Sequence, residues 1–444
     1  MKLTFKNFLT FLLSLTLVFS ALSVCNISVF ADDGDTNVGF DPSPDVPPQE
    51  YTGEFTYTVN KDNLSCTITK YTVSGFVDNL KIPSELDGYN VTAIGEKAFN
   101  SCRYIRNVQI PIGVTAIGAN AFASCANLKT VVLPDTVTTI DRMAFYYNIQ
   151  LSAVNIPDGV TDIGESAFMS CKELKNIDIP VSVTNIGDSA FNYCAALENV
   201  NVAEENAYYS STDGVLFNKD QTTLIRYPAG KNDANYAIPG SVITVYNWAF
   251  GDAVFSDIVI PNSVKKIGTC AFSGCKYLKK VEIPYGVTAI ETSAFRDCTS
   301  LENIILPDSI TTIGSGALRG CSSLKFVKIP RSVTAINTYA VGCSSSGKYY
   351  DDFVVCGYSG TVAESYAETN NLQFFDMVKS LGDVDGNGVV DGADYAMLVS
   401  LVRCEMAAEG LLMKLRADIN GDGIADAFDA IHLDLYLNGV IEWT

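Results

Sequence analysis

The sequence has one histidine in 444 residues, two tryptophans, and 30 Lys and Arg against 50 Asp and Glu. The single histidine, His432, cannot supply a Ser–His–Asp triad, a Cys–His dyad or a multi-histidine metal site in the body of the chain. A net charge of −20 argues against nucleic acid or an anionic membrane as partner, because both attract basic surfaces. Catalysis by carboxylates alone is not excluded.

The N-terminus has the pattern of a secretion signal. A short basic region and an apolar stretch from about Phe8 to Leu22 precede small and branched residues that fit a cleavage site. We therefore expect residues 1–31 to be a signal peptide, with a retained membrane span or lipidation at Cys25 as alternatives. No second apolar stretch follows, so we expect no membrane span after cleavage. Residues 32–50 are acidic and proline-rich, which predicts a disordered linker.

The body of the chain repeats with a period of 23 residues. The unit is V-T-x-I-G-x-x-A-F-x-x-C-x-x-L-x-x-V-x-I-P-x-S, and a proline closes it at this spacing. Ten copies begin at Val91, Val114, Val137, Val160, Val183, Val242, Val264, Val287, Ile310 and Val333. A fixed period of this length is typical of a solenoid, in which no single unit can bury its apolar residues alone.

Each unit is expected to form one coil of the solenoid. The L-x-x-V-x-I segment predicts a short parallel strand that ends at the proline, since proline cannot donate to a ladder. The glycine supplies a bend, and A-F-x-x-C has the spacing of a short helical turn on the opposite wall. The sequence therefore predicts an α/β repeat solenoid of parallel strands plus short helical turns.

Irregular segments divide the chain around this array. We expect an N-terminal cap over residues 51–90, repeats over 91–343, and a C-terminal cap over 344–378, because open coil ends expose apolar surface. Residues 203–236 are an insertion, which we expect to contain a hairpin around Asn218-Lys219-Asp220-Gln221. A separate module is expected over 379–444.

Seven of the 13 cysteines occupy one repeat position, three residues after the phenylalanine of the unit or, in one unit, after Leu318: 102, 125, 171, 194, 275, 298 and 321. We interpret them as a ladder of small buried apolar groups. Asn148 and Ala253 fill the same slot in two units, where a disulfide would lose its partner. A local disulfide at Cys270 or Cys356 and a metal site on the ladder are the alternatives.

The outward strand positions form two columns that are a candidate ligand surface. They are mixed in character and rich in asparagine, with apolar positions in between. A solvated sheet face is the alternative. The candidate residues for binding a protein or a glycan are Val132, Asn176, Asn199, Val259, Ile305 and Phe326.

Two C-terminal segments carry oxygen side chains at loop positions 1, 3, 5, 9 and 12, with glycine at position 6 and a backbone carbonyl at position 7. This pattern is typical of calcium loops, because Ca²⁺ takes oxygen ligands around a tight turn. We predict two Ca²⁺ ions, bound by Asp383, Asp385, Asn387, Val389, Asp391 and Asp394, and by Asp418, Asn420, Asp422, Ile424, Asp426 and Asp429. Aspartate replaces the usual glutamate at position 12, and a solvated acidic turn is the alternative.

These motifs carry two resemblances. The repeat unit over residues 51–378 resembles the BspA-like class of bacterial surface leucine-rich repeat proteins, which implies a leucine-rich repeat fold with a binding or adhesion role. The duplicated calcium loop–helix pattern over residues 381–440, which opens with G-D-V-D-G-N-G, resembles a type I dockerin. That resemblance implies a small all-α, EF-hand-like calcium module that binds a cohesin on a scaffoldin, and hence an extracellular component of a cellulosome.

In dockerins, two loop and two helix positions of each half contact cohesin. They correspond here to Gly392, Ala393, Val399 and Ser400, and to Ala427, Phe428, Asp434 and Leu435. The two sets differ, which favours one orientation of binding, with packing of a small core as the alternative role of Ala427 and Phe428. We expect a secreted, non-catalytic binding protein; the alternative is a dockerin-borne carbohydrate-active enzyme whose catalytic carboxylates the sequence does not identify.

Overall fold

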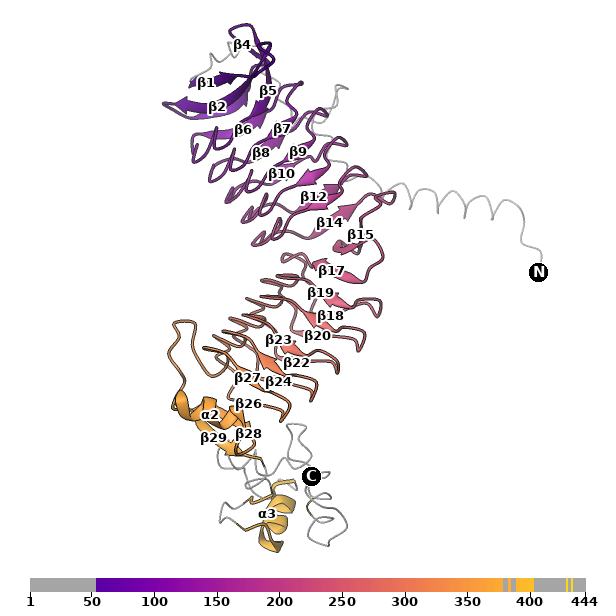
Figure 1. The fold of residues 1–444 in the computed structure, drawn as a ribbon, viewed down its shortest axis with the longest axis vertical. Coiled ribbons are helices and arrows are strands. Elements are labelled where there is room, and N and C mark those ends of the chain that lie inside the picture. The colour runs from indigo at the N-terminus through magenta and orange to yellow at the C-terminus, as the bar shows by residue number, and fades with distance from the viewer. Residues whose placement is uncertain (1–52, 378–381, 385–388, 403–428, 430–432, 434–444) are drawn as a thin grey trace, which may run out of the picture.

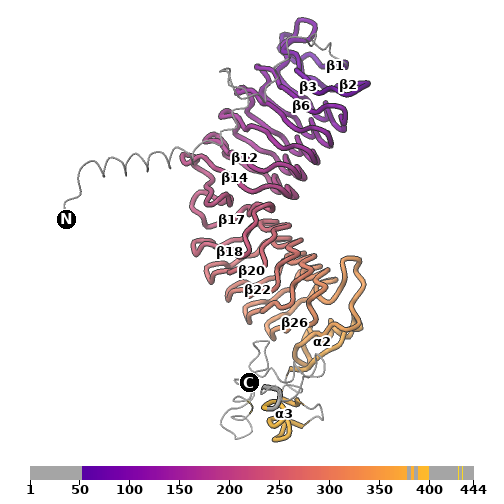
Figure 2. The backbone as a smooth tube through the Cα atoms, turned by 180° about the vertical axis from the view of Figure 1, so that it is seen from behind, coloured from indigo at the N-terminus to yellow at the C-terminus, as the bar shows by residue number. Residues whose placement is uncertain are grey.

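The computed structural model describes residues 53–377, 382–384, 389–402, 429 and 433. The repeats stack as parallel coils into an elongated solenoid, shown in Figure 1 and from behind in Figure 2. Two sides of each coil carry strands, and the third side consists of turns. The predicted repeat solenoid is confirmed, as a mainly β body with few helices among the described residues.

The V-T-x-I segments form one strand-bearing side, which we call the first wall. The strands pair in parallel from coil to coil within three runs, β5 to β13, β19 to β21 and β23 to β27, and Ala93, Ala116 and Thr139 share one register. The strands are β5 (Tyr89–Ile94), β7 (Ala116–Ile117), β9 (Thr139–Ile140), β11 (Asp162–Ile163), β13 (Asn185–Ile186), β19 (Thr244–Val245), β21 (Lys266–Ile267), β23 (Ala289–Ile290), β25 (Thr312–Ile313) and β27 (Ala335–Ile336).

Threonine in V-T-x-I joins neighbouring coils through its side chain. The Thr115 hydroxyl donates to Thr92 O over 3.2 Å, and the Thr138 hydroxyl donates to Thr115 O over 3.2 Å. The Thr311 hydroxyl repeats the contact with Thr288 O at 3.1 Å. The exposed edge of the first wall is therefore bonded from coil to coil by side chains as well as by backbone.

The L-x-x-V-x-I segments form the second wall, also with parallel pairing between coils. Its strands are β3 (Val77–Lys81), β6 (Ile105–Gln109), β8 (Thr130–Val132), β10 (Ala153–Val154), β12 (Asn176–Ile179), β14 (Asn199–Val202), β18 (Asn235–Ala237), β20 (Asp257–Val259), β22 (Lys280–Glu282), β24 (Asn303–Ile305) and β26 (Phe326–Lys328).

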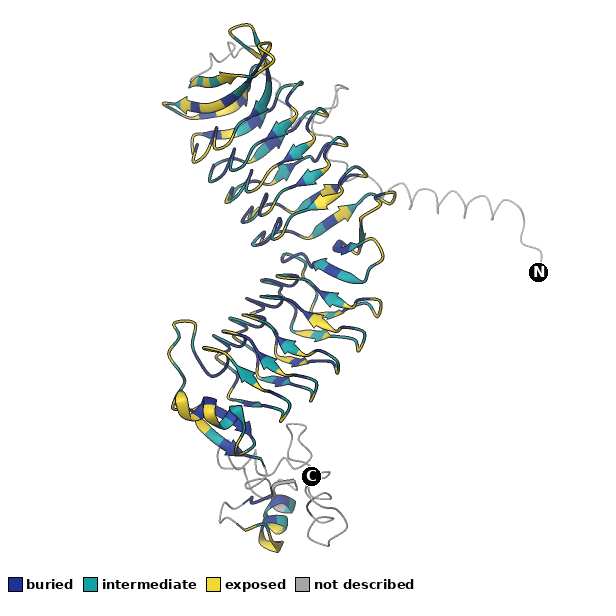
Figure 3. Ribbon diagram, viewed as in Figure 1, coloured by how far each residue is buried: buried dark blue, intermediate teal, exposed yellow. Residues whose placement is uncertain are grey.

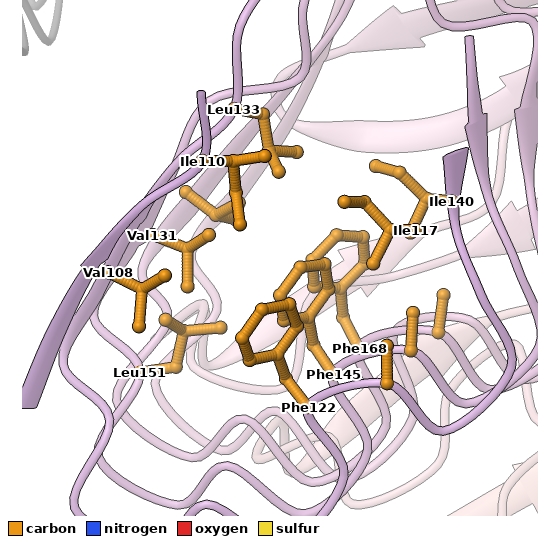
Figure 4. Packing of buried hydrophobic residues seen from close by; sticks show 14 of the residues in the cluster. Val108, Ile110, Ile117, Phe122, Val131, Leu133, Ile140, Phe145, Leu151 and Phe168 are labelled. Carbon is orange, nitrogen blue, oxygen red and sulfur yellow. The ribbon is translucent and has the colours of Figure 1, made fainter. Parts of the chain in front are cut away.

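The phenylalanine of the repeat, which Leu318 and Val341 replace in the last two units, builds the centre of the core. Phe122, Phe145 and Phe168 lie fully buried, with ring centroids 5.5 and 5.3 Å apart and nearly parallel planes. Figure 4 shows this stack between aliphatic residues of the two walls, and Figure 3 shows the buried positions repeating along the inside of the coils. Two clusters of buried residues result, one from Cys66 to Leu216 and one from Val215 to Leu372.

The turn side differs from the predicted helical turn. Around Phe122, Ala121 N donates to Gly118 O and Ala123 N donates to Asn120 O, which are i to i−3 bonds. Intervening N–H groups donate to the next coil instead, for example Phe122 N to Ala144 O over 2.8 Å. Asn120 and Ser124 have φ of 56° and 60°, which is the left-handed region. A right-handed helix cannot continue through either residue.

The glycine after V-T-x-I has a different role from the predicted bend. A Cβ at Gly187 would lie 2.4 Å from Glu165 N, and one at Gly164 would lie 2.4 Å from Arg142 N. Backbones of neighbouring coils therefore approach closely at this point. The absence of a side chain, rather than an unusual φ, explains glycine at these two positions.

Both ends of the array and the insertion have their own elements. β1 (Gly53–Val59), β2 (Ser65–Val73) and β4 (Glu85–Leu86) lie at the N-terminal end. The insertion contains β15 (Tyr209–Thr212), β16 (Val215–Asn218) and β17 (Thr223–Arg226); β16 pairs antiparallel with both neighbours, in the region where a hairpin was expected. β28 (Val354–Gly357), α2 (Val362–Thr369) and β29 (Gln373–Asp376) close the other end, before α3 (Gly392–Val402).

Candidate functional sites

The predicted ligand columns lie on the outer face of the second wall. Strand pairing places Asn176 beside Asn199 and Glu282 beside Ile305, as the column arrangement requires. Val259 is 63% exposed, whereas the other candidates, Val132, Asn176, Asn199, Ile305 and Phe326, are half-buried. Apolar side chains are thus distributed along this face rather than gathered in one patch.

Several polar side chains of this face already form hydrogen bonds with the neighbouring coil. The Asn199 amide donates to Asn176 Oδ1 over 2.9 Å, and the Thr130 hydroxyl donates to Asn107 Oδ1 over 2.8 Å. Gly214 of the insertion lies against Asn199, where an added Cβ would lie 2.5 Å from Asn199 Oδ1. Asn176 and Asn199 therefore stabilise the stack, and the insertion borders the face beside them.

Phe326 has a partly structural role. It packs against a small buried cluster of Val354, Cys356 and Phe375 in β28 and β29. The repeat period predicts that Phe326 points outward. It gives no information about β28 and β29, which continue the second wall beyond the last repeat. β28 pairs with β26 and supplies this neighbour.

The repeat cysteines form a buried ladder on the turn side. The Sγ of Cys125 donates to Phe99 O over 3.0 Å, and Cys298 donates to Phe272 O over 3.1 Å. The same bond to the phenylalanine of the preceding coil is made by Cys171, Cys194, Cys275 and Cys321. No disulfide joins the described ladder cysteines or Cys270. A thiol suits this slot because it is small and apolar and carries one weak donor for a buried carbonyl.

Burial of these thiols makes stability dependent on pH. Burial raises the pKa of Cys194 from 9.0 to about 11, and raises those of Cys171 and Cys298 well above 9.0. The folded state therefore keeps protons that the unfolded chain loses, so the free energy of unfolding falls as pH rises from 9 to 11.

We expect Cys194 alone to account for a loss of about 2 kcal/mol near pH 10.5. Urea unfolding at neutral and alkaline pH measures this loss. Cys194→Ala is the control, and its stability should fall less with pH than that of the parent chain. An identical pH dependence in the two proteins would show that the Cys194 thiol ionises equally in both states.

Arg226 is a buried cation that the sequence analysis did not identify. It lies at the end of β17, is 3% exposed, and donates from Nη1 to Trp248 O over 2.8 Å and to Asn192 Oδ1 over 3.3 Å. Nη2 donates to Gly251 O over 3.3 Å. Burial lowers the pKa of the guanidinium. The sequence feature that could have indicated its burial is the position of a single Arg among the apolar residues of L-I-R-Y-P.

Arg226 occupies the junction where the insertion interrupts the stack. Thr223 pairs with Thr244 of the next coil. Tyr227 N donates to Ala249 O of that coil, just as Phe122 N donates to Ala144 O, so Tyr227 occupies the phenylalanine position of its coil. Tyr227 lies four positions after Thr223, whereas Phe250 lies six positions after Thr244, so this coil is two residues short. The guanidinium therefore donates to Gly251 O, whose equivalent Tyr146 O accepts from Ser124 N in a full coil. It adds a second donor to Trp248 O, which also accepts from Gly251 N.

The first C-terminal loop is described in part. Asp383 and Asp394 are buried, Asp391 N donates to Asp394 Oδ2 over 2.8 Å, and Asp391 Oδ1 accepts from Ala393 N over 2.7 Å. Val389 is 58% exposed, and Leu398 of α3 is buried. Gly392 and Ala393 are exposed at the start of α3, and Val399 is half-buried.

In the second half, Asp429 and Leu433 are buried. The remaining predicted residues lie outside the described part of the chain: Asp385, Asn387, Asp418, Asn420, Asp422, Ile424, Asp426, Ala427, Phe428, Asp434, Leu435 and the side chain of Ser400. Within the described ranges, no three His, Cys, Asp or Glu side chains gather closely enough to hold a metal ion. The described donors nevertheless fit calcium chemically, since Asp383, Asp394 and Asp429 bury carboxylates that prefer a hard cation.

Stacked parallel coils of this period define a leucine-rich repeat protein. The chain belongs to the family described as BspA type leucine rich repeat region, whose model matches residues 92–213 and 232–348. The model of the dockerin type I domain matches residues 381–438. Neither of these two families is catalytic. Among the described residues, no helix is long and apolar enough to cross a membrane.

Several solved structures are similar to this chain. A leucine-rich cell surface protein from Faecalibacterium prausnitzii is 26% identical, with a TM-score of 0.46, and the match covers 75% of this chain and 95% of that one. A leucine-rich repeat protein from Eubacterium ventriosum is 24% identical, with a TM-score of 0.42 and coverage of 65% and 92%. The pneumococcal vaccine antigen PcpA is 20% identical, with a TM-score of 0.49 and coverage of 74% and 98%. No curated protein matches the chain.

Proposed function

We propose that this chain is a secreted, non-catalytic binding protein that its dockerin tethers to a cohesin-bearing scaffold in a calcium-dependent manner. The observation that carries the proposal is the combination of a leucine-rich repeat body with a dockerin type I match over residues 381–438. The repeat body presents a long face of paired strands, and the dockerin supplies attachment. Asp383, Asp394 and Asp429, which the calcium hypothesis requires as ligands, are buried.

Charge supports two bound Ca²⁺ ions. Residues 381–444 contain 12 acidic and 3 basic side chains, a net charge of −9. Two divalent cations would reduce it to −5 and relieve repulsion among the loop carboxylates. Because the ligands come together only when the loops fold, we expect folding of the module to be coupled to calcium. The helix content of residues 381–444, measured by circular dichroism in calcium and in chelator, tests this coupling.

Cohesin binding is tested by calorimetric titration of the full chain with a panel of type I cohesins, in calcium and in excess EDTA. We expect the affinity to fall at least about 100-fold in EDTA, and about 10- to 100-fold for Asp383→Ala in calcium. Asp308→Ala is the matched control, because Asp308 is an exposed acid in the repeats. Tight binding that EDTA leaves unchanged would refute calcium-dependent tethering.

The second half of the module is the proposed preferred cohesin face, because it places Phe428 at a contact position where the first half has Ala393. Phe428→Ala should weaken cohesin binding while the calcium content stays at two ions per chain. Ala393→Ser, a small change at the equivalent position, should have little effect. Equal losses in the two variants would contradict a single preferred face.

The repeat face is the proposed site for a protein or glycan ligand. A pull-down with the full chain against cell-wall glycans and co-secreted proteins identifies the class of ligand. An activity screen on plant polysaccharides addresses the enzyme alternative, with the exposed acids Asp178, Asp257 and Glu282 replaced by their amides. Hydrolysis that these substitutions abolish would replace the binding function by a catalytic one.

A further inference from the structure

The first wall ends at β27 with two backbone acceptors directed away from the stack. One coil earlier, Thr311 O accepts from Thr334 N over 2.8 Å, and Ile313 O accepts from Asn337 N over 2.9 Å. The same pair of bonds joins the two coils before that, at Thr288 O and Ile290 O. Among the hydrogen bonds of the described residues, none ends on Thr334 O or Ile336 O. The next coil, which would supply the donors, is replaced by the C-terminal cap.

A groove runs along this open edge, which we call the cap groove. It has a volume of about 470 Å³ and lies between the last coil and α2. Its lining residues are Thr334, Ala335, Ile336, Asn337, Thr338, Tyr349, Val362, Ser365, Tyr366, Thr369 and Asn370. None of these side chains is charged, although the chain carries a net charge of −20. Half-buried apolar groups alternate in it with exposed hydroxyl and amide groups.

The helix α2 packs near β27 and forms the other side of the groove. Ala363 and Ala367 face the core and are buried, while Val362, Ser365 and Thr369 follow one another at helical spacing on the groove side. The Tyr366 hydroxyl donates to Val341 O over 3.1 Å and fixes the helix to the last coil. Thr334 and Asn337, which flank β27, are exposed next to this fixed helix.

We propose that the cap groove binds an extended, uncharged peptide segment of a partner protein, which pairs in parallel with β27 as one further coil. The two open carbonyls require N–H donors at positions i and i+3, the spacing of Thr334 and Asn337 in the preceding pairing. An extended backbone supplies donors at this spacing whatever its side chains, which is the basis of strand addition at a sheet edge. The hydroxyl and amide groups of the rim then contact the side chains of the peptide.

The probe is a fluorescent peptide, acetyl-Val-Thr-Ala-Ile-Asn-Thr-amide, which has the sequence of residues 333–338 and so mimics the coil that β27 lacks. Fluorescence polarisation with the full chain should show saturable binding. N-methylation of the Thr at the second position or of the Asn should weaken binding at least about tenfold each, since each removes one donor. N-methylation of the Val is the control, because Val333 N bonds within its own coil, to Pro330 O.

Protein variants test whether the probe occupies the cap groove. Thr369→Trp fills the groove and should abolish binding, whereas Glu368→Trp, on the neighbouring exposed position outside the lining, should leave it unchanged. Thermal unfolding of both variants checks that the fold is intact. The proposal is overturned if the peptide does not bind, if the control methylation weakens binding equally, or if Thr369→Trp has no effect. Binding of a neutral oligosaccharide such as cellohexaose that Thr369→Trp abolishes, without peptide binding, would also overturn it.

Discussion

Replacing Phe145 by alanine is expected to lower the free energy of unfolding by about 3–5 kcal/mol. The Phe145 ring is fully buried and stacks between Phe122 and Phe168, at centroid distances of 5.5 and 5.3 Å. Neighbouring coils are bonded to each other above and below, so they cannot collapse into the cavity that the ring leaves. Urea unfolding followed by circular dichroism measures the loss.

Two comparisons separate the lost ring from a general disturbance. Phe145→Leu keeps most of the volume and should cost less than about 1.5 kcal/mol. Phe272 holds the same position in the second buried cluster, between Phe250 and Phe295. Phe145→Ala and Phe272→Ala should therefore be additive in the double variant. A cost below 1 kcal/mol for Phe145→Ala would mean that the coils close around the cavity after all.

Replacing Asn148 by cysteine is expected to raise the free energy of unfolding by about 1–3 kcal/mol. Asn148 occupies the slot of the cysteine ladder and is fully buried, and among the described residues neither Nδ2 nor Oδ1 has a hydrogen-bond partner. Burying both groups without partners is costly. A thiol would restore the bond to the phenylalanine carbonyl of the preceding coil, as Cys125 does with Phe99 O.

The reverse substitution provides the matched test. Cys171→Asn introduces the same amide into the next coil of the ladder and should destabilise the fold by a similar amount. Both variants are compared with the parent by urea unfolding at neutral pH, where the thiols are protonated. If Asn148→Cys lowers stability instead, the amide is satisfied in solution by a buried water, and the slot is polar in this coil.

The fold was predictable from the sequence because the period is exact over most of the array. Proline spacing and the alternation in L-x-x-V-x-I identify the second wall, and the burial of Phe122 and Cys125 agrees with their place in the unit. The turn side was not predictable in the same way. A-F-x-x-C has helical spacing, but spacing alone does not reveal residues with positive φ, such as Asn120 and Ser124, that stop a helix.

The candidate sites were predictable to different extents. The calcium-loop pattern predicts ligand types and positions, because hard-cation chemistry allows few alternatives, and these ligands stay a prediction. The period correctly predicts which residues share an outward column. It does not predict the hydrogen bond that joins Asn176 and Asn199 of neighbouring coils. Arg226 and the cap groove depend on places where the period fails, so no repeat pattern could indicate them.

The hydrogen bonds between coils have a consequence for the evolution of the chain. On the first wall each coil donates to the coil before it, as Thr138 N does to Thr115 O, and on the turn side it donates to the coil after it, as Phe145 N does to Ala167 O. Every coil therefore presents the same donors and acceptors to its two neighbours. A whole coil can therefore be duplicated or deleted without orphaning a backbone group. Each such event changes the reach of the protein by about 4.8 Å. Arg226 marks the coil that is two residues short, where a side-chain N–H takes the place of a backbone donor to Gly251 O.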